Sequence, residues 1–158
     1  MINDKKVMVG WDNTGPTSTN RKIYNHEKME PTGTFRNSTS VLSNSYIDKN
    51  VDVQTNSYTY RVRMEDYCGN IIPASNIGRS INLKISKIDY TVYLTWNSYG
   101  DWANNIQAYL VEYYDNVAGV FKVIAVNPNT DTSFIDTKLR NEDTAFCYRV
   151  RALEDIQA

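Results

Sequence analysis

The sequence predicts an all-β protein built from two tandem β-sandwiches. A strand-like pattern occurs twice, because Tyr60-Arg-Val-Arg63 recurs as Tyr148-Arg-Val-Arg151. Short alternating segments are separated by Gly, Pro, Asn and Asp at intervals of about 8–12 residues, which is typical of sandwiches. No segment keeps a helical period over several turns, so helices are not expected.

Four further blocks recur in the same order, which indicates that a whole domain is duplicated. The pairs are Val7–Trp11 with Val92–Trp96, Ile23–Glu27 with Val111–Asp115, Gly33–Arg36 with Gly119–Lys122, and Ser45–Asp48 with Ser133–Asp136. The spacing changes between blocks, where loops vary most freely. We therefore expect one domain over residues 1–80 and a second over 81–158.

In the first domain, alternation and turn residues predict six strands. They are Lys6–Asp12, Arg21–Glu27, Thr34–Leu42, Ser45–Asp48, Ser57–Asp66 and Ala74–Arg79. In the fifth of these, Tyr58, Tyr60 and Val62 share the inner face, while Arg61 and Arg63 lie on the outer face.

In the second domain, the same signals also predict six strands. They are Ile81–Ile85, Thr91–Trp96, Ala108–Tyr114, Gly119–Val126, Thr132–Asp136 and Phe146–Leu153. A long polar loop between the second and third strands contains Trp102. The two domains follow each other without a Pro- or Ser-rich linker, so we expect a semi-rigid rod.

Composition excludes several classes of function. The formal net charge is -1 and no basic cluster is present, which argues against a nucleic-acid partner. No apolar run approaches the roughly 18 residues of a transmembrane helix, so membrane insertion is not expected. No signal-like apolar segment precedes the first strand.

Both domains resemble a fibronectin type III module, an immunoglobulin-like sandwich. The resemblance lies in Val92–Trp96 as strand B, Tyr109–Tyr113 as strand C and Phe146–Ala152 as strand F, with matching residues in the first domain. It implies core roles for Trp11, Tyr58, Tyr60, Trp96 and Tyr148. The first domain lacks strand A of this pattern and the second lacks strand G. Tyr58 takes the place of the tyrosine-corner residue, whose hydroxyl bonds the preceding loop, and Phe146 takes that place in the second domain.

More narrowly, the chain resembles tandem modules of secreted Bacteroidota proteins that are gliding-motility-associated or type IX secretion substrates. The similar sequence segments are Ser57–Val62 with Asp66–Asn70, Val92–Trp102 and Phe146–Glu154. This resemblance implies a secreted or cell-surface location at the exterior of the outer membrane. It also implies a spacer or adhesion stalk that contacts other domains of a parent protein.

No residue set predicts an enzyme, a cofactor or a metal site. His26, the single histidine, has no catalytic or ligand partner at useful spacing, and we expect it on the surface of its strand. Cys68 and Cys147 occupy different places in the two copies and lack metal-ligand spacing. Asp48 and Asp136, at equivalent strand ends, fit turn formers better than a calcium site.

Two surfaces leave a choice open. The outer-face row Arg61, Arg63, Arg149 and Arg151 could bind a ligand, or it could pair with Glu112 and stack on Tyr114, which we favour. Tyr99 and Trp102 could stack on a sugar or grip a protein, or Trp102 could fold back over the end of the sandwich.

Function therefore has two candidate classes. The first is a non-catalytic spacer or protein-interaction stalk, which could meet another protein by strand addition at the open edge of strand F. The alternative is a carbohydrate- or protein-binding accessory module of a secreted polysaccharide-degrading enzyme, with a surface polysaccharide as a partner.

Overall fold

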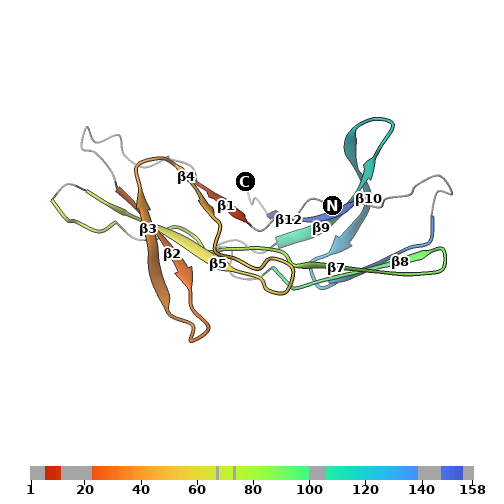
Figure 1. Cartoon of the computed structure of the whole chain (residues 1–158), viewed down its shortest axis with the longest axis horizontal. Helices are drawn as coiled ribbons and strands as arrows, with labels where there is room; N and C mark the ends of the chain where they lie inside the picture. Colours follow the sequence, from red (N-terminus) through yellow and green to blue (C-terminus); the bar gives the residue numbers. More distant parts are fainter. Residues whose placement is uncertain are drawn as a thin grey trace. The chain divides into compact units, whose positions relative to one another are not determined.

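The computed structural model describes residues 6–11, 23–66, 68–72, 74–99, 106–138 and 147–154. The chain divides into two compact units, Met1–Ser80 and Ile81–Ala158. We call them unit 1 and unit 2 and describe each by itself (Figure 1).

Unit 1 contains two antiparallel sheets. Its strands are β1 (Val7–Gly10), β2 (Ile23–Met29), β3 (Phe35–Val41), β4 (Ser45–Asp48), β5 (Thr59–Glu65) and β6 (Gly78–Arg79). One sheet is β1-β4, and the other has the order β3-β2-β5-β6. The predicted last strand is therefore much shorter than expected, because only two residues at its end pair with β5.

Unit 2 is built in the same way. Its strands are β7 (Leu83–Ile88), β8 (Thr91–Trp96), β9 (Ile106–Asp115), β10 (Val120–Pro128), β11 (Ser133–Asp136) and β12 (Tyr148–Glu154). The sheets are β11-β8-β7 and β10-β9-β12. Every pairing is antiparallel.

This strand order confirms two fibronectin type III-like sandwiches. In unit 2 the sheets correspond to strands A, B, E and C′, C, F of that fold, and in unit 1 to B, E and C′, C, F, G. Among the described residues, unit 1 has no strand in the position of A and unit 2 has none in the position of G. The two sheets of each unit face each other across a core, as the alternation of buried and exposed residues along their strands requires.

The core of unit 2 is apolar and aromatic. Its buried cluster comprises Val92, Leu94, Trp96, Ile106, Tyr109, Val111, Tyr113 and Tyr148. Trp96 packs edge-on against Tyr109 with ring centroids 5.6 Å apart, and Tyr113 does the same with Tyr148 at 5.3 Å. Such pairs add about 0.5–1.5 kcal/mol each beyond the area that they bury.

Unit 1 repeats part of this core. Trp11 contacts Tyr24 with centroids 5.2 Å apart, in the manner of Trp96 and Tyr109. Tyr60 is buried, whereas Trp11 and Tyr58 are partly buried. The remaining inner positions of β2 hold polar residues, and these define the site described below.

The structure corrects the matching of the two copies at this strand. Glu27 pairs across to Arg61 and Glu112 to Arg149, so Glu27 corresponds to Glu112 and not to Asp115. The sequence match had made Ile23 the equivalent of Val111, which is buried, yet Ile23 lies on the outer face. An odd slip of register turns every side chain to the other face, and the polar inner face of β2 concealed that slip.

Candidate functional site

The residues predicted to contact a ligand do not form a described site. Trp102 lies outside the described residues. Tyr99 is partly buried against the core of unit 2, and its backbone N–H donates a hydrogen bond of 2.6 Å to the Tyr109 hydroxyl. The proposed role of this loop in binding stays a prediction.

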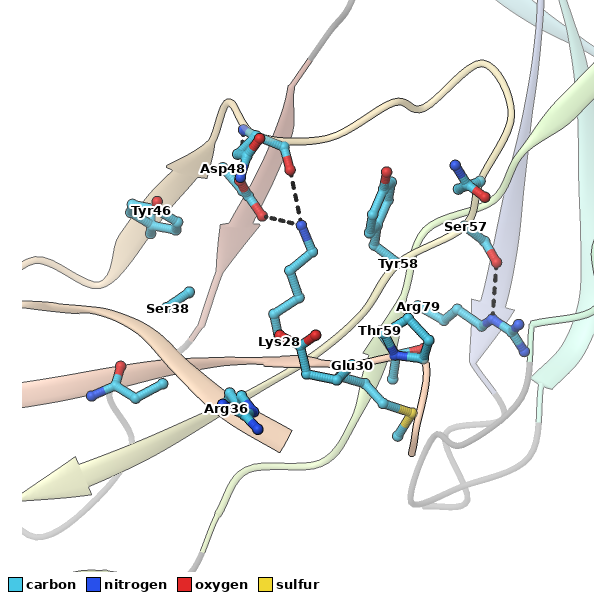
Figure 2. Close-up of a pocket in the computed structure, with 15 residues that line it drawn as sticks. Lys28, Glu30, Arg36, Ser38, Tyr46, Asp48, Ser57, Tyr58, Thr59 and Arg79 are labelled. Carbon is cyan, nitrogen blue, oxygen red and sulfur yellow. Dashed lines mark hydrogen bonds and ion pairs between the residues drawn. The ribbon is translucent and has the colours of Figure 1, made fainter. Parts of the chain in front are cut away.

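The structure instead shows a hollow in unit 1 of about 880 Å³. It lies over the end of β2, the start of β3, β4 and the segment that leads into β5 (Figure 2). Its lining is mostly polar and consists of Lys28, Met29, Glu30, Pro31, Arg36, Asn37, Ser38, Tyr46, Asp48, Asn50, Asn56, Ser57, Tyr58, Thr59 and Arg79.

Lys28 and Asp48 form the centre of this hollow. The Lys28 ammonium donates to Asp48 Oδ2 at 3.1 Å and to the Asn50 carbonyl at 3.0 Å. It also lies 4.3 Å from the centroid of the Tyr58 ring, a cation–π contact. Figure 2 shows the lysine extended toward Asp48 with Tyr58 beside it.

The Asp48 carboxylate is fully used within the protein. Oδ2 also accepts from the Tyr60 hydroxyl at 3.0 Å, and Oδ1 accepts from the Asn50 backbone N–H at 2.8 Å. Desolvation works to raise the pKa of Asp48, but the hydrogen bonds from Asn50, Lys28 and Tyr60 outweigh it and lower that pKa. Burial and the neighbouring charge raise the pKa of Tyr60.

The equivalent aspartate of unit 2 plays a smaller part. Asp136 accepts from the Tyr148 hydroxyl at 3.0 Å and from the Lys138 backbone N–H at 2.9 Å. Both aspartates thus shape the turn that follows their strand, and both also anchor a tyrosine from the facing sheet. Only Asp48 holds a lysine as well.

His26 is the second polar residue on the inner face, and its predicted surface position is wrong. The side chain is 0% exposed, with its ring 4.5 Å from that of Tyr46 and 5.0 Å from that of Tyr60. The residue faces inward because it alternates with Asn25 and Glu27, which face out. A histidine without exposed atoms cannot act as a base toward an incoming substrate in this structure.

Hydrogen bonding fixes the state of the His26 ring. The Ser38 hydroxyl donates to the His26 carbonyl at 3.0 Å, so the ring Nδ1–H donates to Ser38 Oγ, 2.6 Å away. Nε2 is then a bare nitrogen, buried and without a hydrogen-bond partner among the described residues. Burial lowers the pKa of His26.

Tyr58 behaves as the tyrosine-corner resemblance implies. Its hydroxyl accepts a hydrogen bond of 2.7 Å from the Asp52 backbone N–H, in the loop that precedes its strand. The ring is therefore fixed at one wall of the hollow. Phe146 lies outside the described residues.

The arginine row is held by carboxylates, as we favoured. Glu112 accepts from both Arg149 and Arg151, and the hydrogen bond from Arg149 lowers the pKa of Glu112. Glu27 binds Arg61 and Arg63 in the same way, which the sequence analysis had not identified.

The stacking partner of this row differs from the prediction. Arg149 lies 4.1 Å from the ring centroid of Phe121, and Tyr114 packs edge-on against that same ring. The Arg149 guanidinium therefore stacks on Phe121 of β10, and not on Tyr114 of β9, the strand between β12 and β10.

Other candidate chemistry is sparse. Within the described parts of the chain, no group of three or more His, Cys, Asp or Glu side chains could hold a metal ion. Cys68 and Cys147 are both exposed free thiols. None of the described segments forms a helix long and apolar enough to cross a membrane.

Solved structures of other proteins include distant likenesses to this chain. No family model matches the sequence, and no curated protein does. The FN1–FN3 domains of chicken CNTN1 align with 15% identity and a TM-score of 0.36, over 96% of this chain and 58% of that one. The central fibronectin-III array of RIM-binding protein aligns with 16% identity and a TM-score of 0.36, over 98% of this chain and 66% of that one.

This chain therefore spans less than two thirds of either structure. The fold assignment rests on the strand order and pairing described above, which define a tandem pair of fibronectin type III-like modules.

Proposed function

We propose that the chain is a non-catalytic structural and protein-interaction module of a secreted or cell-surface protein. Its place in a gliding-motility-associated, type IX secretion substrate is part of this proposal and rests on the sequence resemblance alone. Two sandwiches joined by a short connection, with β6 ending at Arg79 and β7 starting at Leu83, suit a spacer or stalk.

The observation behind the interaction role is the outer edge of β12. In unit 1, the equivalent strand β5 has β2 on one side and β6 on the other. Among the described residues, β12 pairs only with β9. A strand with unpaired backbone groups is a template for another extended segment, so a strand of a neighbouring chain is the partner we propose.

Light scattering over a range of protein concentrations tests this role. We expect a dimer or larger assembly that dissociates on dilution. Leu153→Lys, which places a charge on β12 at an exposed position, should shift the protein to monomer. Val117→Lys, in a fully exposed turn of the same unit, is the matched control and should not. A protein that is monomeric at all concentrations would contradict strand addition.

The alternative, a carbohydrate- or protein-binding accessory module of a polysaccharide-degrading enzyme, was predicted from the Trp102 loop. That loop lies outside the described residues. The alternative therefore rests on sequence, and Trp102→Ala with unchanged stability and lost polysaccharide binding would support it.

A further inference from the structure

The hollow in unit 1 lies at a place where an inner-face residue differs between the copies. With the register set by Glu27 and Glu112, Lys28 corresponds to Tyr113 and His26 to Val111. In unit 2 the Tyr113 ring packs on Tyr148 and helps to close the apolar core. In unit 1 a narrow lysine chain takes that place, and open space remains beside it.

The lining of the hollow has an uncompensated positive charge. Lys28 and Arg36 are directly opposite each other on β2 and β3, a like-charge pair that disfavours strand pairing unless an anion neutralises it. Asp48 neutralises Lys28. The exposed Arg36 guanidinium has no hydrogen bond or ion pair to any residue that the structure describes. Glu30 is the only other carboxylate of the lining, against a third cation, Arg79.

The rest of the lining favours a hydroxyl-rich ligand. It offers the amides of Asn50 and Asn56, the hydroxyl groups of Ser57 and Thr59 and the rings of Tyr46 and Tyr58. The Ser38 hydroxyl is held by His26, and the Asn37 amide bonds Asn25 and Ser40. Only Met29 and Pro31 are apolar and non-aromatic. A ligand with apolar side chains would find few contacts here, whereas a sugar can exchange many hydrogen bonds with amides and hydroxyls and rest on an aromatic ring.

The size of the hollow points the same way. Its volume of about 880 Å³ lies within the range of small-ligand sites, about 300–1,000 Å³, and exceeds the space that a single inorganic anion needs. Amide and hydroxyl groups are distributed over several elements, so a chain of two or more sugar units would contact more of them than one unit would.

We propose that this hollow binds an acidic oligosaccharide, with a sugar carboxylate paired to Arg36 and sugar hydroxyls bonded to the amide and hydroxyl lining. The site belongs to unit 1 alone. It goes beyond the spacer role and does not depend on strand addition at β12, because the two involve different units.

Isothermal titration of the whole chain with trigalacturonic acid tests the proposal, with its methyl ester as a neutral probe of nearly the same shape. We expect the acid to bind and the ester to bind at least about tenfold more weakly, since a charge-assisted hydrogen bond is lost. Binding of the acid should weaken as salt is raised.

Three variants locate the site. Arg36→Gln, at an exposed position that leaves the fold intact, should weaken binding of the acid about tenfold. Lys28→Tyr places the residue of unit 2 in the hollow and should abolish binding by filling it. Lys84→Gln, an exposed cation on β7 of unit 2, is the matched control and should leave binding unchanged.

Several results would overturn the proposal. These are equal binding of acid and ester, no binding at millimolar concentration, or binding that Arg36→Gln does not affect. Full competition by inorganic phosphate would show a simple anion site instead, and tighter binding of hexaglutamate would show a peptide site. Each of these results is independent of the light-scattering outcome, so failure here leaves the spacer role untouched.

Discussion

The matched strands β2 and β9 carry inner faces of different chemistry in the two units. On β9 the inward residues are Tyr109, Val111 and Tyr113, and all are buried in an apolar core. On β2 they are Tyr24, His26 and Lys28. One fold thus accepts a histidine and a lysine between its sheets, provided that Asp48, Ser38 and the tyrosine rings satisfy most of their polar groups.

The largest expected difference between the units comes from the matched aspartates. Asp48→Ala removes three hydrogen-bond acceptor contacts and leaves the Lys28 ammonium without its counter-charge, with the Asn50 carbonyl and the Tyr58 ring as its remaining described partners. The free energy of unfolding of unit 1 should therefore fall by about 3–5 kcal/mol. Asp136→Ala removes two hydrogen bonds whose donors are uncharged and should cost unit 2 about 1–3 kcal/mol. Urea unfolding followed by tryptophan fluorescence measures both. Equal losses would show that the lysine adds nothing to the role of this residue.

Acid should affect unit 1 before unit 2. The pKa of His26 lies below its ordinary value of 6.5, so between 6.5 and the lower native value the unfolded chain binds a proton that the native chain does not. The free energy of unfolding of unit 1 is therefore fully retained above pH 6.5. It falls by up to about 1.4 kcal/mol per pH unit as the pH decreases through this window.

Replacing the histidine provides the control for that measurement. His26→Val, which places the residue of unit 2 in β2, should remove the dependence between pH 6.5 and about 5.5, a range that lies above the titration of the carboxylates. His26 is the only histidine in the chain, so unit 2 should stay constant over this range. If the variant keeps the acid sensitivity of the original protein, another group is responsible.

The smallest effect is expected where the units agree. Glu27→Gln and Glu112→Gln each replace a carboxylate that binds two arginines with a neutral amide. Both changes should lower the free energy of unfolding by about 0.5–1 kcal/mol, since the arginines are partly exposed. Chemical unfolding of each variant gives the two values. A large difference between them would show that the outer faces also diverge.

The fold was predictable from sequence because its signals are local and repeated. Alternation along Tyr58–Val62 and its copy, together with turn residues, indicated strands and faces correctly at β5 and β12. The strand order then followed from the resemblance, since short antiparallel strands with these turns fit few topologies.

The hollow was not predictable in the same way. Matching by hydrophobic pattern assumes an apolar inner face, and His26 and Lys28 break that assumption at the one strand where it mattered. A better signal was present in the sequence: each copy has a glutamate that can face the two arginines of its Tyr-Arg-Val-Arg strand, which is β5 in unit 1 and β12 in unit 2. Alignment on Glu27 and Glu112 would have placed Lys28 inside, although not the distances that form the hollow.

The single neighbour of β12 has a consequence for hydrogen exchange. Along an antiparallel edge strand, successive backbone N–H groups point alternately toward the paired strand and toward solvent. Amides from Arg149 to Leu153 should therefore exchange alternately slowly and quickly with deuterium while that edge is open. In β5, the N–H groups that point toward β2 and those that point away from it both have acceptors, because Tyr60 pairs with Gly78 and the Val62 N–H donates to Ser75 Oγ. The amides of β5 should therefore exchange slowly and evenly. Loss of the alternation at β12 on raising the protein concentration would report, residue by residue, the moment at which its edge is occupied.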